Sequence, residues 1–365
     1  MEQTVRALSL KLCALAGLLL ALYGLAYLDQ RLSARENDGS RLRVALFING
    51  TLGDKSFFDA AARGMAHARL TLPVRTRVIE GGTDPTRWEA ALTDLADSGE
   101  YDVVVAGTFT MVPYVQKLAA GFPAMRFIVF DASVDYRACA CANVYSMLFR
   151  QNEGAYLAGF LAARLMRQGL PGAPAGSALG VVGGMRFPVI EDFVIGFGAG
   201  ARAADPEVRI LSQYANAFSD PAAGKEIAKA QFGQGAGLVF HAAGATGQGV
   251  NEAAAEAGRY AIAVDMDQYA LYSESHPRRA AGIVTSVLKA VDAGLLRALR
   301  LQLDGGLAYG SAESLGLAEG GIRLARRSRV LDAAPEPLWR ELEAQRDAIV
   351  AGRIRVPGAF AAVPR

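Results

Sequence analysis

Short apolar runs alternate along the chain with longer segments in which apolar residues recur at roughly every third or fourth position. Runs of roughly four to eight apolar residues between turn residues are typical of buried strands, and the wider spacing is typical of helices. The first run, Arg43–Ile48, ends at Asn49-Gly50, a pair that favours a turn. The runs predicted as strands are 43–48, 75–79, 101–106, 126–130, 144–149, 178–182, 209–214, 237–240 and 260–264.

Helical spacing fills most of the segments between these runs. The predicted helices are 56–70, 85–98, 111–120, 154–166, 189–202, 221–231, 248–256 and 337–351, with a further helix beginning near Ser286. Strand–helix–strand alternation predicts parallel sheets covered on both faces. The alternation restarts after Asn152, which predicts an α/β fold of two lobes, each a doubly wound sheet. We expect residues 42–146 and 284–310 in the first lobe, and 147–283 and 311–360 in the second.

The N-terminus predicts export. Arg6 and Lys11 precede 17 uncharged residues, Leu12–Leu28, a length between a signal-peptide core and a membrane span of about 20 residues. Two interpretations of residues 1–28 stay open: a signal peptide cleaved after Ala26, or an uncleaved anchor in the inner membrane. Cys13 lies at the start of the run, where it does not suit lipid attachment, and the polar residues 29–41 are typical of a linker. In either case the body of the chain is expected in the periplasm or outside the cytoplasm.

Composition and short motifs exclude several classes of protein. The chain has 365 residues, with 38 Lys and Arg against 36 Asp and Glu, so it lacks the basic footprint of a general nucleic-acid binder. Three histidines leave little material for a metal site, and neither a phosphate-binding loop, a full dinucleotide fingerprint nor a nucleophile elbow is present. We therefore expect no metal, no cofactor and no enzymatic activity. Cys139 and Cys141 are expected as two thiols or as an intermolecular link, since a bond across one residue is strained.

The residues that follow the predicted strands are polar, glycine-rich and partly aromatic. In open parallel sheets, ligands bind at the carboxyl ends of the strands. The segments collected there are 49–57, 107–108, 131, 183–185, 216–220, 241–247 and 265–268. Two lobes that face each other with these ends would enclose a cleft.

A series of these segments resembles one family of proteins. The segment 50–57 (GTLGDKSF) resembles the opening motif of the basic membrane protein family, substrate-binding proteins of the purine nucleoside receptor type that serve ABC importers. The resemblance covers residues 42–357 and continues through 130–131, 152–159, 183–188, 218–225, 243–250, 264–268, 285–289 and 352–357. Each motif is weak by itself, and their order carries the resemblance. It implies a type I periplasmic-binding fold with a nucleoside held between two lobes.

The resemblance assigns the base of the nucleoside to two aromatic rings and two polar side chains. By motif position the rings are Phe57 and Phe240, although both residues are also ordinary core aromatics. Asp131 resembles the base-contacting Asp of the family. Asn49 stands where the family has a second Asp, and an amide offers a donor as well as an acceptor, so the base preference is open. Asn49 is equally suited to a turn before Gly50.

The sugar hydroxyls are assigned in the same way. Asp265 and Lys289 occupy the ribose-binding positions of the family, with Lys289 expected in the first turn of the helix near Ser286. Gly244 would let the backbone approach the sugar. Asp54 is included among the ligand-binding candidates, and Asp54 and Ser56 are also expected to cap the helix that follows them.

The function expected from the resemblance is capture of a nucleoside, most simply a purine nucleoside, and its presentation to the permease of an ABC importer. Two other functions remain open from the sequence: a membrane-tethered ligand sensor of the same fold, and a binder of another flat heterocycle. An enzyme acting on nucleosides would need a paired acid and base beside a phosphate site, and no such set is visible.

Overall fold

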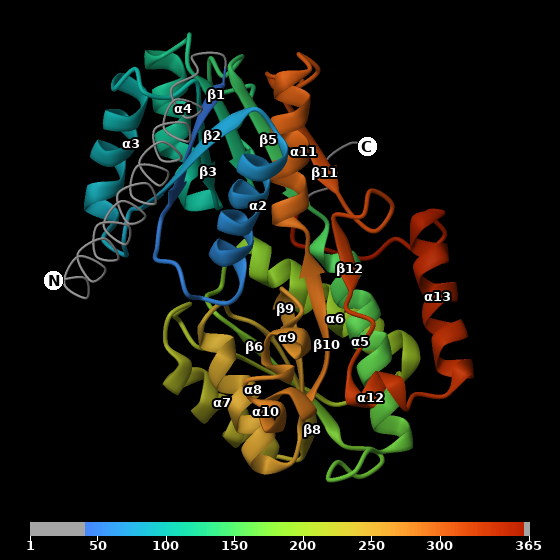
Figure 1. Ribbon diagram of the computed structural model, residues 1–365. Helices are drawn as coiled ribbons and strands as arrows, with labels where there is room; N and C mark the ends of the chain where they lie inside the picture. The colour runs from blue at the N-terminus through green and yellow to red at the C-terminus, as the bar shows by residue number, and fades with distance from the viewer. Residues whose placement is uncertain (1–40, 361–365) are drawn as a thin grey trace, which may run out of the picture.

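The computed structural model describes residues 41–360, and two six-stranded sheets organise this part of the chain into two lobes (Figure 1). The predicted signal peptide or anchor and most of the predicted linker lie outside the described residues. Within residues 41–360, no helix is both long enough and apolar enough to cross a membrane.

The first sheet has the strand order β11-β5-β4-β3-β1-β2, and every neighbouring pair is parallel. Its strands are β1 (Leu42–Ile48), β2 (Val74–Glu80), β3 (Val103–Gly107), β4 (Arg126–Phe130), β5 (Val144–Phe149) and β11 (Ser311–Leu315). Successive residues of β1 point to opposite faces, so Leu46 packs with α2 (Phe57–Thr71) and α11 (Val291–Leu303), while Phe47 packs with α3 (Trp88–Asp97) and α4 (Val112–Gly121).

The second sheet has the order β12-β10-β9-β8-β6-β7, parallel except for the pair β10 and β12. Its strands are β6 (Ala178–Gly183), β7 (Ile210–Tyr214), β8 (Ala236–Ala242), β9 (Tyr260–Asp265), β10 (Ile283–Lys289) and β12 (Ile322–Leu324). Its helices are α5 (Gln151–Gln168), α6 (Pro188–Ala204), α7 (Pro221–Gly233), α8 (Thr246–Ala257), α9 (Gln268–Ser273), α10 (Pro277–Ala281), α12 (Arg329–Asp332) and α13 (Glu336–Val350). Two 3-10 turns, Pro85–Arg87 and Phe109–Met111, follow β2 and β3.

Two predicted lobe boundaries differ from the strand pairing. Residues 284–289 were expected in the first lobe, partly as a helix, but they form β10 and pair with β9 in the second sheet. The β-branched run at Ile283–Thr285 favours a strand, and the Thr285 hydroxyl donates to the carbonyl of Ala325 beside it. Residues 311–315 were expected in the second lobe, but they form β11 and pair with β5 in the first sheet. The chain therefore crosses between the sheets after β5, after β10 and after β11.

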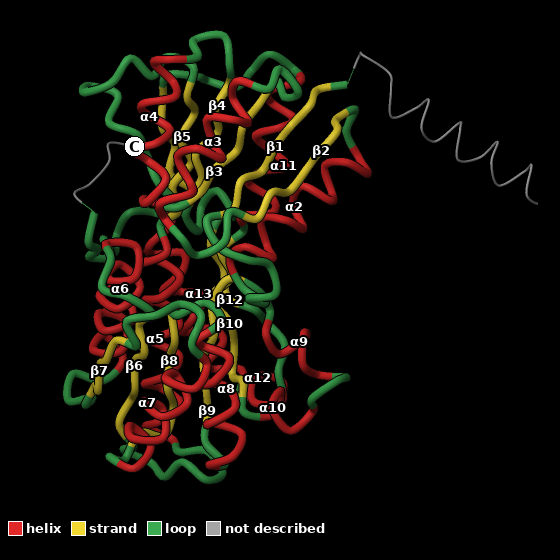
Figure 2. Tube along the Cα trace, turned by 90° about the vertical axis from the view of Figure 1, so that its left-hand side faces the viewer, coloured by secondary structure: helices red, strands yellow, loops and turns green. Residues whose placement is uncertain are grey.

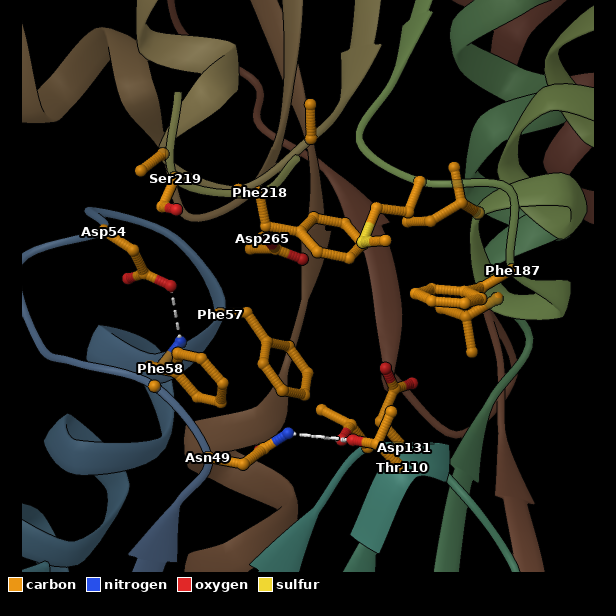
Figure 3. Close-up of a pocket in the computed structure, with 18 of the residues that line it drawn as sticks. Asn49, Asp54, Phe57, Phe58, Thr110, Asp131, Phe187, Phe218, Ser219 and Asp265 are labelled. Carbon is orange, nitrogen blue, oxygen red and sulfur yellow. Dashed lines mark hydrogen bonds between the residues drawn. The ribbon is translucent and has the colours of Figure 1, made fainter. Parts of the chain in front are cut away.

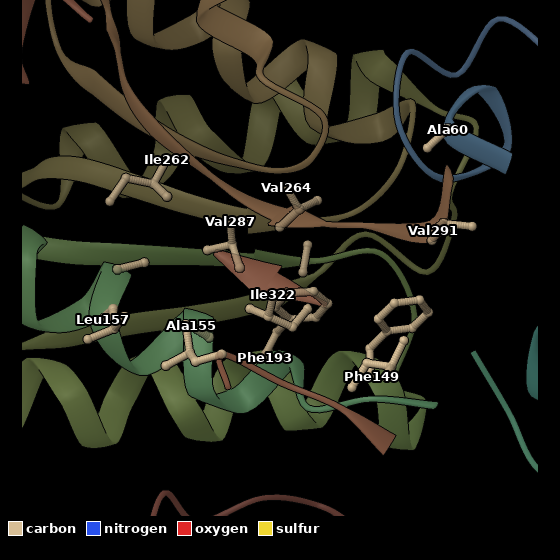
Figure 4. Packing of buried hydrophobic residues seen from close by; sticks show 14 of the residues in the cluster. Ala60, Phe149, Ala155, Leu157, Phe193, Ile262, Val264, Val287, Val291 and Ile322 are labelled. Carbon is tan, nitrogen blue, oxygen red and sulfur yellow. The ribbon is translucent and has the colours of Figure 1, made fainter. Parts of the chain in front are cut away.

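Close packing of α5 on α6 shapes the second lobe. A side-chain carbon on Gly159 of α5 would come within 2.0 Å of the carbonyl oxygen of Phe197, and one on Gly200 of α6 within 1.9 Å of that of Tyr156. Glycine at these two positions allows the helix backbones to touch. Figure 4 shows how α5, with Ala155, and α6, with Phe193, pack together beneath the strands near Val287.

The cysteine pair differs from the prediction. Cys139 and Cys141 form a disulfide with each other, in the segment between β4 and β5. They are therefore neither free thiols nor an intermolecular link in this structure.

Candidate functional site

A cavity of about 800 Å³ lies between the two lobes, lined by residues that follow strands of both sheets. The carboxyl ends of the two sheets face each other across it (Figures 1 and 2). This is the position expected for a ligand in facing parallel sheets. Seven of the eight predicted ligand-binding residues line the cavity: Asn49, Asp54, Phe57, Asp131, Gly244, Asp265 and Lys289. Phe240 does not.

A buried ion pair joins the lobes inside the cavity. The Nζ atom of Lys289, the last residue of β10, donates to Oδ1 of Asp131, which follows β4, over 2.6 Å. The side chains are only 2% and 8% exposed. Burial raises the pKa of Asp131, and the ammonium of Lys289 opposes this effect. Lys289 and Asp265, the two residues assigned to the sugar, both line the cavity, and Lys289 contacts Asp131 directly.

Asp265 is the second buried carboxylate of the cavity. Its carboxylate accepts a hydrogen bond from the Ser56 hydroxyl of the first lobe. Burial raises the pKa of Asp265 to about 6, although Lys289 and the hydrogen bond from Ser56 act in the opposite direction. Asp131 and Asp265 both have positive φ, at 61° and 66°. Non-glycine residues in this conformation carry backbone strain and cluster at functional sites.

Asp54 has a mainly structural role in this arrangement. Its carboxylate accepts hydrogen bonds from the backbone N–H groups of Ser56, Phe58 and Asp59 at the start of α2. The predicted cap by Asp54 is therefore confirmed. The side chain of Ser56 does not cap α2, because its hydroxyl donates its hydrogen bond to Asp265.

Asn49 is held in the cavity wall by two hydroxyl groups. Its Nδ2 atom donates to Oγ1 of Thr108 over 3.0 Å and to Oγ1 of Thr110 over 2.9 Å. Both amide donors are thus used within the first lobe (Figure 3). The side chain is part of the lining rather than a simple turn residue, and Thr110 was not identified from the sequence.

Phe57 lies against the charged end of the cavity. Its ring stacks on that of Phe130, with centroids 5.4 Å apart and an angle of 27°. The Nζ atom of Lys289 is 5.5 Å from the ring centroid. Phe57 therefore offers an aromatic surface beside the ion pair, and Figure 3 shows its ring in the cavity with Asp131.

Phe240 lies in the core of the second lobe, so its assignment as the second stacking ring is wrong for this structure. The residue is fully buried, and its ring stacks on Phe197 of α6 with centroids 4.7 Å apart and an angle of 9°. It precedes the end of β8 by two residues, and all seven residues of this strand are buried. Because both faces of β8 are covered, the apolar pattern does not show which face Phe240 occupies.

Other aromatic rings line the cavity where Phe240 was expected. Phe187 follows β6 and Phe218 follows β7; their ring centroids are 6.3 Å apart. Phe109 of the first lobe contacts Phe187 across the cleft, with centroids 4.4 Å apart. Phe218 lies within a segment collected from the sequence as a strand end, so position after a strand was the signal that could have found it.

Gly244 adopts the backbone conformation that its predicted role needs. Its φ is +56°, and an added side-chain carbon would lie 3.2 Å from the carbonyl oxygen of Phe218. The turn after β8 therefore runs close to the Phe218 segment, and both line the cavity.

Two glutamine side chains of the second lobe donate hydrogen bonds across the cleft to backbone carbonyls of the first lobe. Nε2 of Gln248 in α8 donates to the carbonyl oxygen of Asp54 over 2.9 Å, and Nε2 of Gln268 in α9 donates to that of Lys55 over 2.6 Å. Lys55 also places its ammonium 5.1 Å from the ring centroid of Tyr272. The two lobes are thus in direct contact on this side of the cavity.

No group of histidine, cysteine and acidic side chains suited to a metal ion occurs among residues 41–360. His241, which follows the predicted strand end, is buried, and burial lowers its pKa to about 4. Its Nε2 atom lies 3.1 Å from Oδ1 of Asn251, so the ring is part of the packing behind the cavity.

Comparisons with known proteins find one family of relatives. The family model described as ABC transporter substrate-binding protein PnrA-like matches residues 41–359. Basic membrane protein A of Borreliella afzelii is 28% identical over 322 residues, 86% of this chain and 91% of that protein. The CD4+ T-cell-stimulating antigen of Listeria monocytogenes is 25% identical over 98% of this chain and 99% of its own length.

A solved structure supports the fold. The ABC transporter solute-binding protein of Aeropyrum pernix K1 superposes with a TM-score of 0.75 at 27% identity, covering 87% of this chain and 94% of that chain. The two-lobed fold of this chain and the family match point to a binding protein and not to an enzyme. Such a protein acts outside the cytoplasm and has a permease as its partner. The chain therefore belongs to the PnrA-like substrate-binding proteins of ABC transporters.

Proposed function

We propose that the protein captures a nucleoside, preferentially a purine nucleoside, in the interlobe cavity and delivers it to the permease of an ABC importer. The observation that carries the proposal is the composition of this one cavity. It places aromatic rings beside a buried cluster of carboxylates and one ammonium.

The aromatic lining suits a flat, weakly polar base. Phe57 offers a ring beside the charged cluster, while Phe187 and Phe218 offer rings from the opposite lobe. Stacking of a base on an aromatic side chain contributes about 1–3 kcal/mol. Both lobes would therefore contribute to binding the base.

The charged end suits sugar hydroxyls. Ionised Asp265 accepts hydrogen bonds, and the ammonium of Lys289 donates them. Lys289 is the single cationic residue in the cavity lining described here, against the carboxylates of Asp54, Asp131 and Asp265. This excess of negative charge favours an uncharged nucleoside over a phosphorylated nucleotide.

A ligand that bridges the lobes would stabilise the closed arrangement, because it contacts both walls only there. The cross-lobe contacts of Gln248 and Gln268 would add to that stabilisation. A permease could then distinguish the loaded protein by its closed shape.

The proposed function also requires that the protein is exported. Residues 1–28 would direct the chain across the inner membrane, either as a signal peptide cleaved after Ala26 or as an anchor. The intact mass of the protein purified from its native envelope tests this point. A chain that begins at Tyr27 establishes cleavage, and the full mass in the membrane fraction establishes the anchor.

A thermal-shift screen tests nucleoside capture. Ligand that binds the folded state raises the melting temperature by mass action. We expect a rise with guanosine, inosine or adenosine that Phe57→Ala reduces, while Leu70→Ala, at an exposed position outside the cavity lining, leaves it unchanged. A shift with another flat heterocycle and none with any nucleoside would replace the substrate class. A shift with sugars alone would overturn the aromatic role.

A further inference from the structure

The charged side chains that line the cavity lie close together. Asp131 follows β4, Asp265 ends β9 and Lys289 ends β10, strands near the side of each sheet where the chain crosses. Lys289 contacts Asp131, and Ser56 beside Asp54 contacts Asp265, so the charges form one cluster. The electrostatic influence of Asp54, Asp131 and Lys289 on the pKa of Asp265 agrees with this placement.

Five aromatic side chains line the cavity in addition to Phe57, Phe58 and Phe193. Trp88 follows β2, Phe109 and Tyr114 follow β3, Phe187 follows β6, and Phe218 follows β7. We name these five residues the aromatic mouth. In the sheet orders, β2 is three strands from β4, and β7 is three strands from β9. At a strand spacing of about 4.8 Å, the end of β2 lies roughly 14 Å from that of β4, and the end of β7 lies as far from that of β9.

The aromatic mouth is built for contact with an apolar partner. Phe187 lies between Phe109 and Phe218, so the three rings form a row that spans both lobes. Phe218 is 37% exposed, which makes it one of the few large apolar side chains exposed among the residues described. Exposed apolar surface at the edge of a cavity marks a place for a ligand.

The volume of the cavity also suits a ligand larger than an unsubstituted nucleoside. Cavities that hold drug-sized ligands have volumes of roughly 300–1,000 Å³, and such ligands bury most of their surface. At about 800 Å³ this cavity lies in the upper part of that range. An unsubstituted nucleoside anchored at the charged cluster would leave part of the aromatic mouth uncovered.

We propose that the aromatic mouth is a second subsite, which takes a flat apolar substituent carried by the base. The preferred ligand is then a nucleoside extended by an aromatic or other flat apolar group. This inference rests on the proposed function, since it assumes that the sugar lies at the charged cluster.

Two matched ligand pairs test the subsite by calorimetric titration of the purified protein: adenosine with N6-benzyladenosine, and guanosine with N2-benzylguanosine. We expect the benzyl compound of at least one pair to bind about tenfold more tightly than its parent, the size of one added stacking contact. Equal or weaker binding of both benzyl compounds, with a parent nucleoside bound, would overturn the subsite and leave the proposed function intact.

Substitutions in the aromatic mouth test whether it is the source of the tighter binding of the benzyl compounds. Phe109→Ala and Tyr114→Ala, both at lining residues that the proposed function does not assign to the base, are expected to remove most of the tenfold preference and to change the affinity for the parent nucleoside less than about twofold. Phe360→Ala is the matched control, because Phe360 is 38% exposed and lies outside the lining. A benzyl preference that persists in both cavity variants would overturn the subsite. Failure of all four compounds to bind would overturn the proposed function together with the subsite.

Discussion

The ammonium of Lys289, from the second sheet, lies 2.6 Å from the carboxylate of Asp131, from the first sheet, with both groups buried in the interlobe cavity. Removing one partner of a buried ion pair leaves an uncompensated charge or forces its neutralisation. The pair therefore links closure of the lobes to the chemistry of the binding site.

A double-mutant cycle tests this link. Lys289→Met leaves Asp131 without its cationic partner and is expected to lower the free energy of unfolding by up to about 3–5 kcal/mol. Asp131→Asn in the same chain should restore part of this loss, because the unpaired charge is gone. Denaturant unfolding of the two single variants and the double variant measures the coupling. Strictly additive effects would show that the two groups do not interact in solution.

Substitutions at Phe57 and Phe240 should affect different properties of the protein, nucleoside affinity and stability. Phe57→Ala should weaken nucleoside binding by about 1–3 kcal/mol, because it removes a stacking surface. Phe240→Ala should lower the free energy of unfolding by about 3–5 kcal/mol, because it leaves a void beside Phe197. Calorimetric titration and denaturant unfolding of both variants check this. The reverse result, with Phe240→Ala stable but unable to bind, would restore Phe240 as a ligand contact.

Much of the fold could be predicted from the apolar pattern, because parallel strands covered on both faces give short continuous apolar runs. The predicted strand 126–130 coincides with β4, and 144–149 with β5. The pattern was less informative at 283–289, where Thr285, Ser286 and Lys289 interrupt a strand and permit a helical interpretation. β11 was missed for a related reason: Ser311–Leu315 is mostly small and polar, and only Leu315 is buried.

The site was predictable where strand ends determine it. Asp131 and Asp265 directly follow or end strands, so their place at the cavity could be inferred from the sequence. Position after a strand could also have found Phe218, but its pairing with Phe187 could not be predicted, because it depends on how the turns after β6 and β7 bring the two rings together. The contact of Lys289 with Asp131 could not be predicted from the sequence either, since the two residues belong to facing lobes.

The stability of the protein should fall as the pH rises through the range in which Asp265 ionises. Burial raises its pKa to about 6 from a model-peptide value of 3.8, so between these values the folded chain binds more protons than the unfolded chain. Two pKa units correspond to about 3 kcal/mol, all of it lost by pH 7. Asp265→Asn should remove this dependence in unfolding measurements between pH 4 and 7.

Asp192 provides a control for this effect. Burial also raises its pKa to about 6, but its oxygens accept hydrogen bonds from Gln151 and from the backbone of Ala359, outside the cavity lining. Asp192→Asn should flatten the pH dependence by a comparable amount and retain nucleoside binding, whereas Asp265→Asn should lose it. If the stability of the wild-type protein rises between pH 4 and 7, burial does not raise the pKa of Asp265 and Asp192 as described.

Closure should depend on the two glutamines that reach across the cleft. Gln248→Ala and Gln268→Ala each remove a hydrogen bond worth about 1 kcal/mol, so each should weaken nucleoside binding by roughly fivefold. Small-angle X-ray scattering should show a larger radius of gyration for the ligand-free double variant. Lys225→Ala is the control, since Lys225 pairs with Glu252 and Glu256 within the second lobe. Unchanged affinity in the double variant would show that these contacts do not stabilise closure.

Binding of a nucleoside in the interlobe cavity can be measured by isothermal titration of the purified protein with guanosine, inosine and adenosine. We expect one site per chain for at least one of them, with a dissociation constant in the micromolar range or below, and a loss of about fivefold or more in Phe57→Ala. Absence of heat with all three nucleosides at millimolar concentration, from protein that unfolds cooperatively, would contradict it.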